Sequence, residues 1–269
     1  MIKKIIKEIP YSLKIKRAVY GKLSDASLKQ NVVMLHTGRS GSQVLGNMLN
    51  ERKDFHWAGE IFEPHMAKKL SVKDFNKEVS NERRKKIAAN FGFEVKRLDQ
   101  LHMNPNCLNM KPQELVVELQ KLINIKFILL ERKNYLRRAI SAQLGRDKKT
   151  WHSVKKSNSL SKTFIDIEKF ETGIKKQPLL ELFESMEENF QIFKQILPNN
   201  ALLITYEDDI LQDPRKAYHK ICDYVGVNLD NVTPKLKRTN PFEVHQLISN
   251  YDEVKDLLVG TKFEWMLFD

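Results

Sequence analysis

A short apolar run that ends at a glycine-bearing turn and continues as a helical pattern constrains the fold of this chain most. Residues 31–37 (NVVMLHT) read as a buried parallel strand, and Val44, Leu45, Met48 and Leu49 recur at helical spacing after the turn GRSGSQ. The pattern predicts a strand, a tight turn and a helix, which open a βα unit. Backbone amides and the positive end of the helix dipole converge at such a turn, so it is typical of an anion site, most often for phosphate.

Further strands and helices alternate along the rest of the chain. We expect strands at 91–95, 126–130 and 201–205, and helices at 112–123, 179–197, 214–225 and 241–258. This alternation predicts an α/β fold, with a central, mostly parallel sheet flanked by helices on both faces. Neither a repeat nor a long linker divides the sequence. We therefore expect one domain over 31–269, preceded by a basic segment at 1–30.

Composition excludes several classes of protein. No stretch approaches 18 uninterrupted apolar residues, which argues against a membrane span. Only Cys107 and Cys222 are present, so we expect no disulfide framework and a reducing, cytoplasmic compartment. Spacings typical of zinc ligands, such as CxxC and HExxH, are absent, and structural zinc is not expected.

The positive charge is concentrated near the N-terminus. The formal net charge is +12, of which residues 1–22 carry +6, and Ile2, Ile5, Ile6 and Ile9 share one helical face there. Packing on the domain is the favoured interpretation, and a weak peripheral contact with the inner membrane face is the other. Nucleic-acid binding ranks last because aromatic residues do not alternate with basic ones as stacking surfaces require. The oligomeric state is left open.

A second candidate site follows the strand 126–130. Ligands in open α/β sheets bind beyond the carboxyl ends of the strands, which is where Arg132 stands. Ser141 could join Arg132 at one phosphate if the next helix starts a few residues after Arg132. Arg137 and Arg138 are interpreted as a solvated helix face.

The glycine turn departs from the phosphate loop of ATP-using enzymes. The pattern GxxxxGK[ST] is not met, because no lysine follows the second glycine. A nucleotide-dependent kinase or ATPase on the same type of sheet is therefore the alternative function and not the leading one.

Three ordered motifs together resemble the PAPS-dependent sulfotransferases (PAPS is 3′-phosphoadenosine-5′-phosphosulfate). GRSGSQVLGNMLN resembles their 5′-phosphosulfate loop, FILLERKNYLRRAIS their 3′-phosphate element, and LLITYEDDILQDPRKAYHKICDYVGV their tyrosine-glutamate-aspartate segment. WAGEIFEP and the C-terminal run from LKRTNPF to FEWML also fit. The resemblance covers roughly 31–267. It is to the bacterial carbohydrate and glycolipid branch, similar to nodulation-factor and trehalose-type enzymes, and implies a three-layer fold like that of the P-loop NTPases.

The resemblance implies which residues bind the donor. The 5′-phosphosulfate would be held by the loop, the 3′-phosphate by Arg132 and Ser141, and a looser match places a basic stretch over the nucleotide. The implied donor-binding residues are Gly38, Arg39, Ser40, Gly41, Ser42, Gln43, Arg132, Ser141, Lys237 and Arg238. Gln43 stands where the family usually has threonine or serine. No metal is expected to be required, because Arg39 and the loop amides would neutralise the developing charge.

The implied reaction moves a sulfuryl group in line from PAPS to a hydroxyl of a carbohydrate, glycolipid or related polar acceptor, leaving adenosine 3′,5′-bisphosphate. Arg39 and Glu60 are the expected catalytic residues, and Glu60 matches the glutamate proposed as base in similar bacterial enzymes. Glu63, His65 and His36 are substitutes for Glu60, although His36 is better explained as a structural histidine.

The acceptor is expected to meet the segments 54–111 and 146–178, and the residues predicted to bind it are Glu63, His65 and Trp151. Glu207 and Asp208 are interpreted as loop and helix-capping residues.

Overall fold

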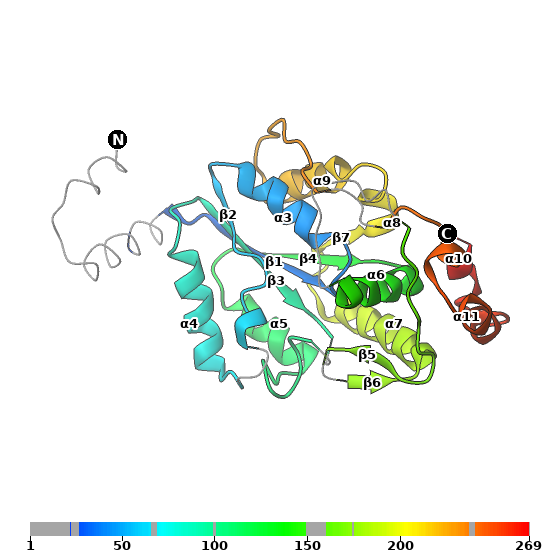
Figure 1. Cartoon of the computed structure of the whole chain (residues 1–269). Helices are drawn as coiled ribbons and strands as arrows, with labels where there is room; N and C mark the ends of the chain where they lie inside the picture. Colours follow the sequence, from blue (N-terminus) through cyan, green and yellow to red (C-terminus); the bar gives the residue numbers. More distant parts are fainter. Residues whose placement is uncertain are drawn as a thin grey trace.

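In the computed structural model, five parallel strands form one sheet in the order β2-β3-β1-β4-β7 (Figure 1). The structure describes residues 22, 27–65, 69–98, 101–148, 160–173, 175–236 and 240–268. The strands are β1 (Gln30–His36), β2 (Phe55–Trp57), β3 (Asn90–Lys96), β4 (Ile125–Glu131) and β7 (Leu202–Thr205). The expected α/β class with a mostly parallel central sheet is therefore confirmed.

Both faces of the sheet are covered, which explains why its strands read as continuous apolar runs. Val33 and Leu35 of β1 point to one face, where they pack with α4 (Val72–Arg83), α5 (Pro112–Gln120) and α7 (Leu179–Ile196). Val32 and Met34 point to the other, against α3 (Ser42–Glu51) and α9 (Arg215–Val225). Figure 1 shows these two helical layers above and below the sheet.

A third apolar cluster lies beside the sheet. It joins α6 (Tyr135–Lys148) and α7 to the C-terminal elements, which are α10 (Val244–Leu247), α11 (Tyr251–Leu258) and the 3-10 helix η2 (Glu264–Leu267). The predicted helix over 241–258 is thus two short helices. Ile248 interrupts them, with an extended backbone and an isolated bridge to Thr163.

Several elements were not predicted from the sequence. They are β2, α4, the 3-10 helix η1 (Glu63–His65), the short α8 (Tyr206–Asp209) and an antiparallel hairpin of β5 (Phe170–Thr172) with β6 (Lys175–Gln177). β2 and the hairpin strands have three residues each, which is too short for a periodic signal. Among the described residues, no helix combines the length and apolar character needed to cross a bilayer.

The order of the strands places the switch in winding direction between β1 and β4. The chain passes from β1 to β2 and β3 on one side of β1, and then crosses to β4 on the other side. The carboxyl ends of β1 and β4 register with each other, with Leu35 opposite Leu129. Loops that follow two such strands form the crevice in which α/β sheets bind ligands.

Candidate anion and nucleotide site

The loop from Thr37 to Gly41, between β1 and α3, is held in an uncommon backbone conformation. Gly38, Arg39 and Gly41 have φ of 75°, 55° and 91°, in the left-handed region that costs a non-glycine residue about 1 kcal/mol or more. Gly41 is the N-cap of α3, and no side chain among the described residues caps this helix. The first amides of α3 therefore lack an intrahelical acceptor, an arrangement that favours an anion at this position.

Gly41 is also confined by its surroundings. A Cβ atom at this position would lie 3.1 Å from side-chain atoms of Ile210 and Tyr206, which belong to the segment after β7. A side chain here would therefore have to displace Ile210 or Tyr206, in addition to the strain of the left-handed backbone.

Two arginine side chains donate hydrogen bonds to backbone carbonyl groups of this loop. Arg138 of α6 donates to the Thr37 carbonyl oxygen from Nη2 at 2.6 Å and from Nε at 3.2 Å. Arg132 Nη1 donates to the Arg39 carbonyl oxygen at 2.9 Å. Because the C=O and N–H of a trans peptide point in opposite directions, the Arg132 bond turns the Ser40 amide away from Arg132.

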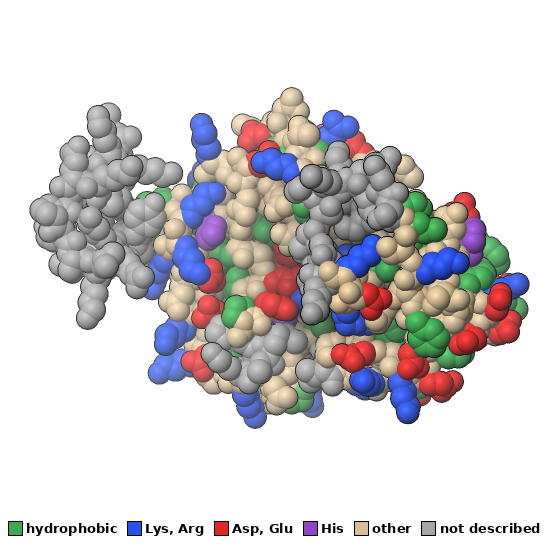
Figure 2. Space-filling model, in the orientation of Figure 1, with side chains coloured by type: hydrophobic (Ala, Val, Ile, Leu, Met, Phe, Trp, Pro, Cys, Tyr) green, Lys and Arg blue, Asp and Glu red, His purple; other side chains and the backbone are tan. Residues whose placement is uncertain are grey.

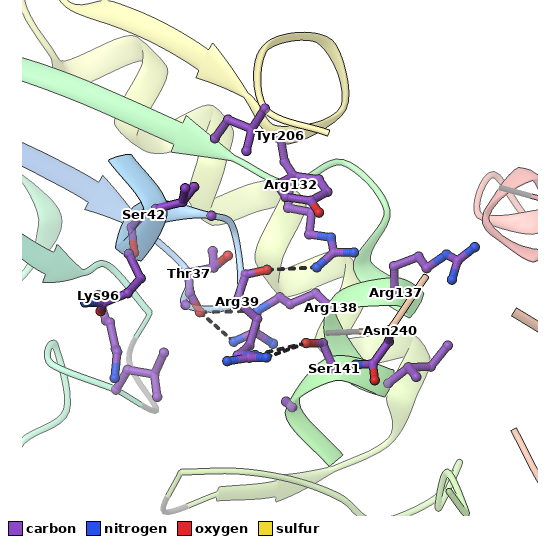
Figure 3. Close-up of a pocket in the computed structure, with 18 of the residues that line it drawn as sticks. Thr37, Arg39, Ser42, Lys96, Arg132, Arg137, Arg138, Ser141, Tyr206 and Asn240 are labelled. Atoms are coloured by element: carbon purple, nitrogen blue, oxygen red, sulfur yellow. Dashed lines mark hydrogen bonds between the residues drawn. The ribbon is translucent and has the colours of Figure 1, made fainter. Parts of the chain in front are cut away.

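The loop and α6 are joined directly. Arg39 donates to the Ser141 hydroxyl from Nε at 3.0 Å and from Nη2 at 2.8 Å (Figure 3). The two predicted phosphate elements thus meet at one place. α6 begins at Tyr135, three residues after Arg132, as a shared site with Ser141 requires.

The N-terminus of α6 is capped by the side chains of Asn134 and Glu207. The Asn134 side chain accepts from the Arg137 amide at 2.7 Å, and Glu207 of α8 accepts from the amides of Lys133 and Asn134, both at 3.0 Å. Asp208 contacts Lys133 Nζ at 2.8 Å. Glu207 and Asp208 therefore have the structural roles predicted for them.

The interpretation of Arg137 and Arg138 as a solvated helix face is wrong. Their exposed fractions are only 6% and 4%. Arg137 donates to the Phe242 carbonyl oxygen and Arg138 donates to the Thr37 carbonyl oxygen. Both side chains therefore form hydrogen bonds with backbone segments that pack against α6. α6 has almost no solvated face because it is enclosed by the loop, α7 and the C-terminal elements.

These groups line a cavity of about 680 Å³ (Figure 3). Arg132 stacks on the ring of Tyr206, with its guanidinium carbon 4.3 Å from the ring centroid. The buried polar atoms here that have no hydrogen-bond partner among the described residues include Thr37 Oγ1, Ser40 Oγ and Arg138 Nη1. Such orphaned donors are costly unless a ligand satisfies them.

The cationic groups keep their charge at neutral pH. Burial, with a contribution from the neighbouring Arg132, lowers the pKa of Arg39 to about 10. Burial lowers the pKa of Arg138 to about 9. Both remain protonated at pH 7, so the cavity presents positive charge around the loop.

Two carboxylates and a lysine form another part of the cavity wall. Lys96, the last residue of β3, contacts Glu60 at 2.6 Å and Glu63 at 2.8 Å. His102 Nε2 lies 3.2 Å from Glu63. Hydrogen bonds from His102 and Lys96 hold the pKa of Glu63 far below its usual range. Burial opposes the charge on Lys96, but Glu60 and Glu63 raise its pKa.

This cluster also has the composition of a metal site. Glu60, Glu63 and His102 offer ligand atoms within 4.8 Å of one another. The Lys96 ammonium already bridges the two carboxylates and supplies the positive charge there.

The structure describes two more of the predicted residues, Gln43 and His36. Gln43 lines the cavity, and its Nε2 donates to Asn47 Oδ1 at 3.5 Å along the exposed side of α3. His36 is fully buried and contacts Glu94 at 3.1 Å, as expected of a structural histidine. Trp151, Lys237 and Arg238 lie outside the described residues, as does the side chain of His65.

The cavity is also lined by residues that the sequence did not indicate as site residues, among them Lys96, Arg138 and Tyr206. Lys96 could have been found by extending the predicted strand 91–95 by one residue, to its carboxyl end. Both segments expected to meet the acceptor contribute to the wall, through Glu60 and Glu63 and through Glu171 to Gly173.

Comparisons with known proteins identify structural neighbours only. No protein-family model matches the sequence, and no curated protein matches it significantly. The structure is similar to a sulfotransferase domain from the curacin biosynthetic pathway, with 15% identity and a TM-score of 0.47 over 89% of each chain. It is also similar to a sulfotransferase from Alicyclobacillus acidocaldarius, with 12% identity and a TM-score of 0.47 over 89% of this chain and 96% of that one.

Proposed function

We propose that the protein is a PAPS-dependent sulfotransferase. The observation that carries the proposal is the bond between Arg39 of the loop and Ser141 of α6, inside a cavity that Arg132 also lines. It brings together the two elements predicted to bind phosphate, which suits a nucleotide with phosphate groups on both its 5′ and 3′ positions. ATP carries no 3′-phosphate and would leave the second element without a ligand.

The residues present fit such a donor. The uncapped amides of α3 and Arg138 Nη1 are donors that a phosphosulfate would satisfy. Arg132 and Ser141 would hold the 3′-phosphate, and the Tyr206 ring keeps the Arg132 guanidinium in place. PAPS supplies the activated sulfuryl group, and the chain orients it and stabilises charge on the leaving phosphate.

Glu60 is the proposed general base. It lines the same cavity as the loop, and 27% of its side chain is exposed, so an acceptor hydroxyl can reach it. In this role its carboxylate takes the hydroxyl proton as the acceptor oxygen bonds to sulfur and the bond from sulfur to the leaving phosphate breaks. Lys96 holds the carboxylate at 2.6 Å and fixes its position.

The proposed acceptor is a polyhydroxylated molecule such as a carbohydrate or glycolipid headgroup. Glu60, Glu63 and Lys96 give this part of the cavity closely spaced donors and acceptors, which suit hydroxyl-rich ligands better than apolar ones. On the face that Figure 2 shows, basic and acidic side chains are interspersed, unlike the basic stripe of a nucleic-acid binder.

Calorimetric titration with adenosine 3′,5′-bisphosphate, AMP and ATP tests the proposal. We expect binding that requires the 3′-phosphate and falls by about tenfold to a hundredfold in Arg132→Ala, since a charge-assisted hydrogen bond contributes about 1.5–3 kcal/mol. Arg84→Ala, at the exposed end of α4, is the matched control and should bind as the wild type does. Binding of ATP in preference to the bisphosphate would refute the sulfotransferase and favour a kinase or ATPase.

A further inference from the structure

We propose that His36 is a positioning residue that presets the anion-binding loop by fixing the peptide between Thr37 and Gly38. The inference goes beyond the proposed function because it concerns the loop before any ligand binds, and it holds whichever anion the loop receives.

The two polar ends of this one peptide group are held by different elements. Its N–H, on Gly38, donates to His36 Nδ1 at 3.0 Å. Its C=O, on Thr37, accepts from Arg138 Nη2 at 2.6 Å and from Nε at 3.2 Å. His36 comes from β1 and Arg138 from α6, and both side chains are buried. The peptide plane is therefore fixed from both sides.

The hydrogen bond from Gly38 determines the tautomer of His36. Because Nδ1 accepts, the proton of the neutral ring lies on Nε2. Nε2 lies 3.1 Å from Glu94 Oε2, and the other oxygen of Glu94 accepts from Trp57 Nε1 at 2.7 Å. Glu94 belongs to β3, so the imidazole lies between the neighbouring strand and the loop.

The loop needs this restraint because its backbone is strained. Gly38 and Arg39 are consecutive left-handed residues, and such conformations persist only where the surroundings enforce them. Gly38 can adopt many backbone angles, so without the His36 contact the peptide before it would be restrained only through its carbonyl, by Arg138. A rotated peptide would remove the acceptor of Arg138 and displace Arg39 from Ser141.

Two substitutions separate this role from a general structural one. In His36→Asn, the amide oxygen lies at the same distance along the side chain as Nδ1 and can accept from Gly38. In His36→Gln, the amide group reaches toward Glu94 in place of Nε2, and the Gly38 amide loses its acceptor. Both variants are neutral and polar, so the pair differs chiefly in which contact survives.

The first measurement is amide hydrogen exchange at Gly38 in the full-length protein, followed by NMR. We expect a protected amide in the wild type and in His36→Asn, and exchange at least about tenfold faster in His36→Gln, as for an amide that has lost a bond of about 1.5 kcal/mol. A fast-exchanging Gly38 amide in the folded wild type would overturn the inference by itself, without any variant.

The second measurement is the affinity for adenosine 3′,5′-bisphosphate. His36→Asn should stay within about threefold of the wild type, and His36→Gln should bind about tenfold more weakly. Equal losses in the two variants would show that His36 only fills space, and the inference would fail. A wild type that binds no bisphosphate would refute the proposed function, whereas the exchange pattern at Gly38 would still decide the role of His36.

Discussion

Arg39 and Ser141 are 102 residues apart in the sequence, yet the guanidinium of one donates two hydrogen bonds to the hydroxyl of the other. A serine hydroxyl has two acceptor lone pairs and one O–H donor. Accepting from Arg39 leaves the Ser141 O–H able to donate to a phosphate oxygen. The same contact that joins the loop to α6 therefore orients Ser141 for a ligand.

Ser141→Ala should weaken binding of adenosine 3′,5′-bisphosphate by about tenfold, because one hydrogen bond to a charged group is lost and Arg39 loses its partner. Calorimetry measures the change. The matched control is Ser185→Ala on α7, whose hydroxyl donates to the Leu182 carbonyl oxygen within its own helix. Unchanged affinity in Ser141→Ala would remove Ser141 from the binding site.

Gly41→Ala should destabilise the protein by about 2–4 kcal/mol, the sum of left-handed strain and overpacking. The added methyl group would meet Ile210 and Tyr206 at 3.1 Å. Chemical denaturation measures the free energy of unfolding. Gly260→Ala is the control, since Gly260 has φ of 76° and nothing within 4 Å of its Cβ position, so it should lose only the strain, about 1 kcal/mol. Similar losses in both variants would contradict the close packing around Gly41.

Glu60→Gln should lower the rate of sulfuryl transfer by about a hundredfold or more and leave bisphosphate affinity unchanged, because a glutamine cannot take the acceptor proton. The assay follows transfer of labelled sulfate from PAPS to a panel of carbohydrates and glycolipids. Glu171→Gln, on the hairpin that also lines the cavity, is the control and should keep most of its activity. A fully active Glu60→Gln would assign the base to another residue.

Acidification should destabilise the protein as pH falls below about 6.5, the ordinary value for histidine. His102 is buried, and this burial lowers its pKa, so the unfolded chain takes up a proton at a pH where the folded protein does not. The stability that neutral His102 contributes is complete above pH 6.5 and is lost progressively below it.

His102→Asn isolates this effect, because asparagine does not titrate. Its side-chain oxygen can still accept the hydrogen bond that the Lys96 backbone amide donates to His102 Nδ1 at 2.9 Å. The free energy of unfolding, measured by denaturant titration at pH 7.5 and 5.5, should fall less in the variant than in the wild type. An identical pH dependence in the two proteins would exclude His102 as a source.

The sequence was sufficient to predict the central strands and the loop that follows β1 because those signals are local. β1 and β4 are buried on both faces and read as apolar runs, and the loop Thr37–Gly41 follows β1 directly. The roles of Glu207 and Asp208 could likewise be predicted from their place after β7.

The errors concern contacts between distant segments. Arg138 appears solvated in the sequence because its acceptor, the Thr37 carbonyl, lies 101 residues away. Lys96 acquires its importance only when Glu60 and Glu63 fold back against β3. Backbone acceptors and partners brought close by the sheet leave no periodic trace in a single sequence.

The N-terminus of α3, which no side chain among the described residues caps, should make the stability of the protein depend on bound anions. Gly41 offers no side chain to close the helix, so its leading amides would find their acceptor in whatever anion enters the loop. A bound anion would supply the hydrogen-bond acceptors that the first turn of α3 lacks. Melting temperature should therefore climb with the concentration of a fitting anion, which makes a thermal-shift screen of sulfated and phosphorylated compounds a direct route to the natural ligands.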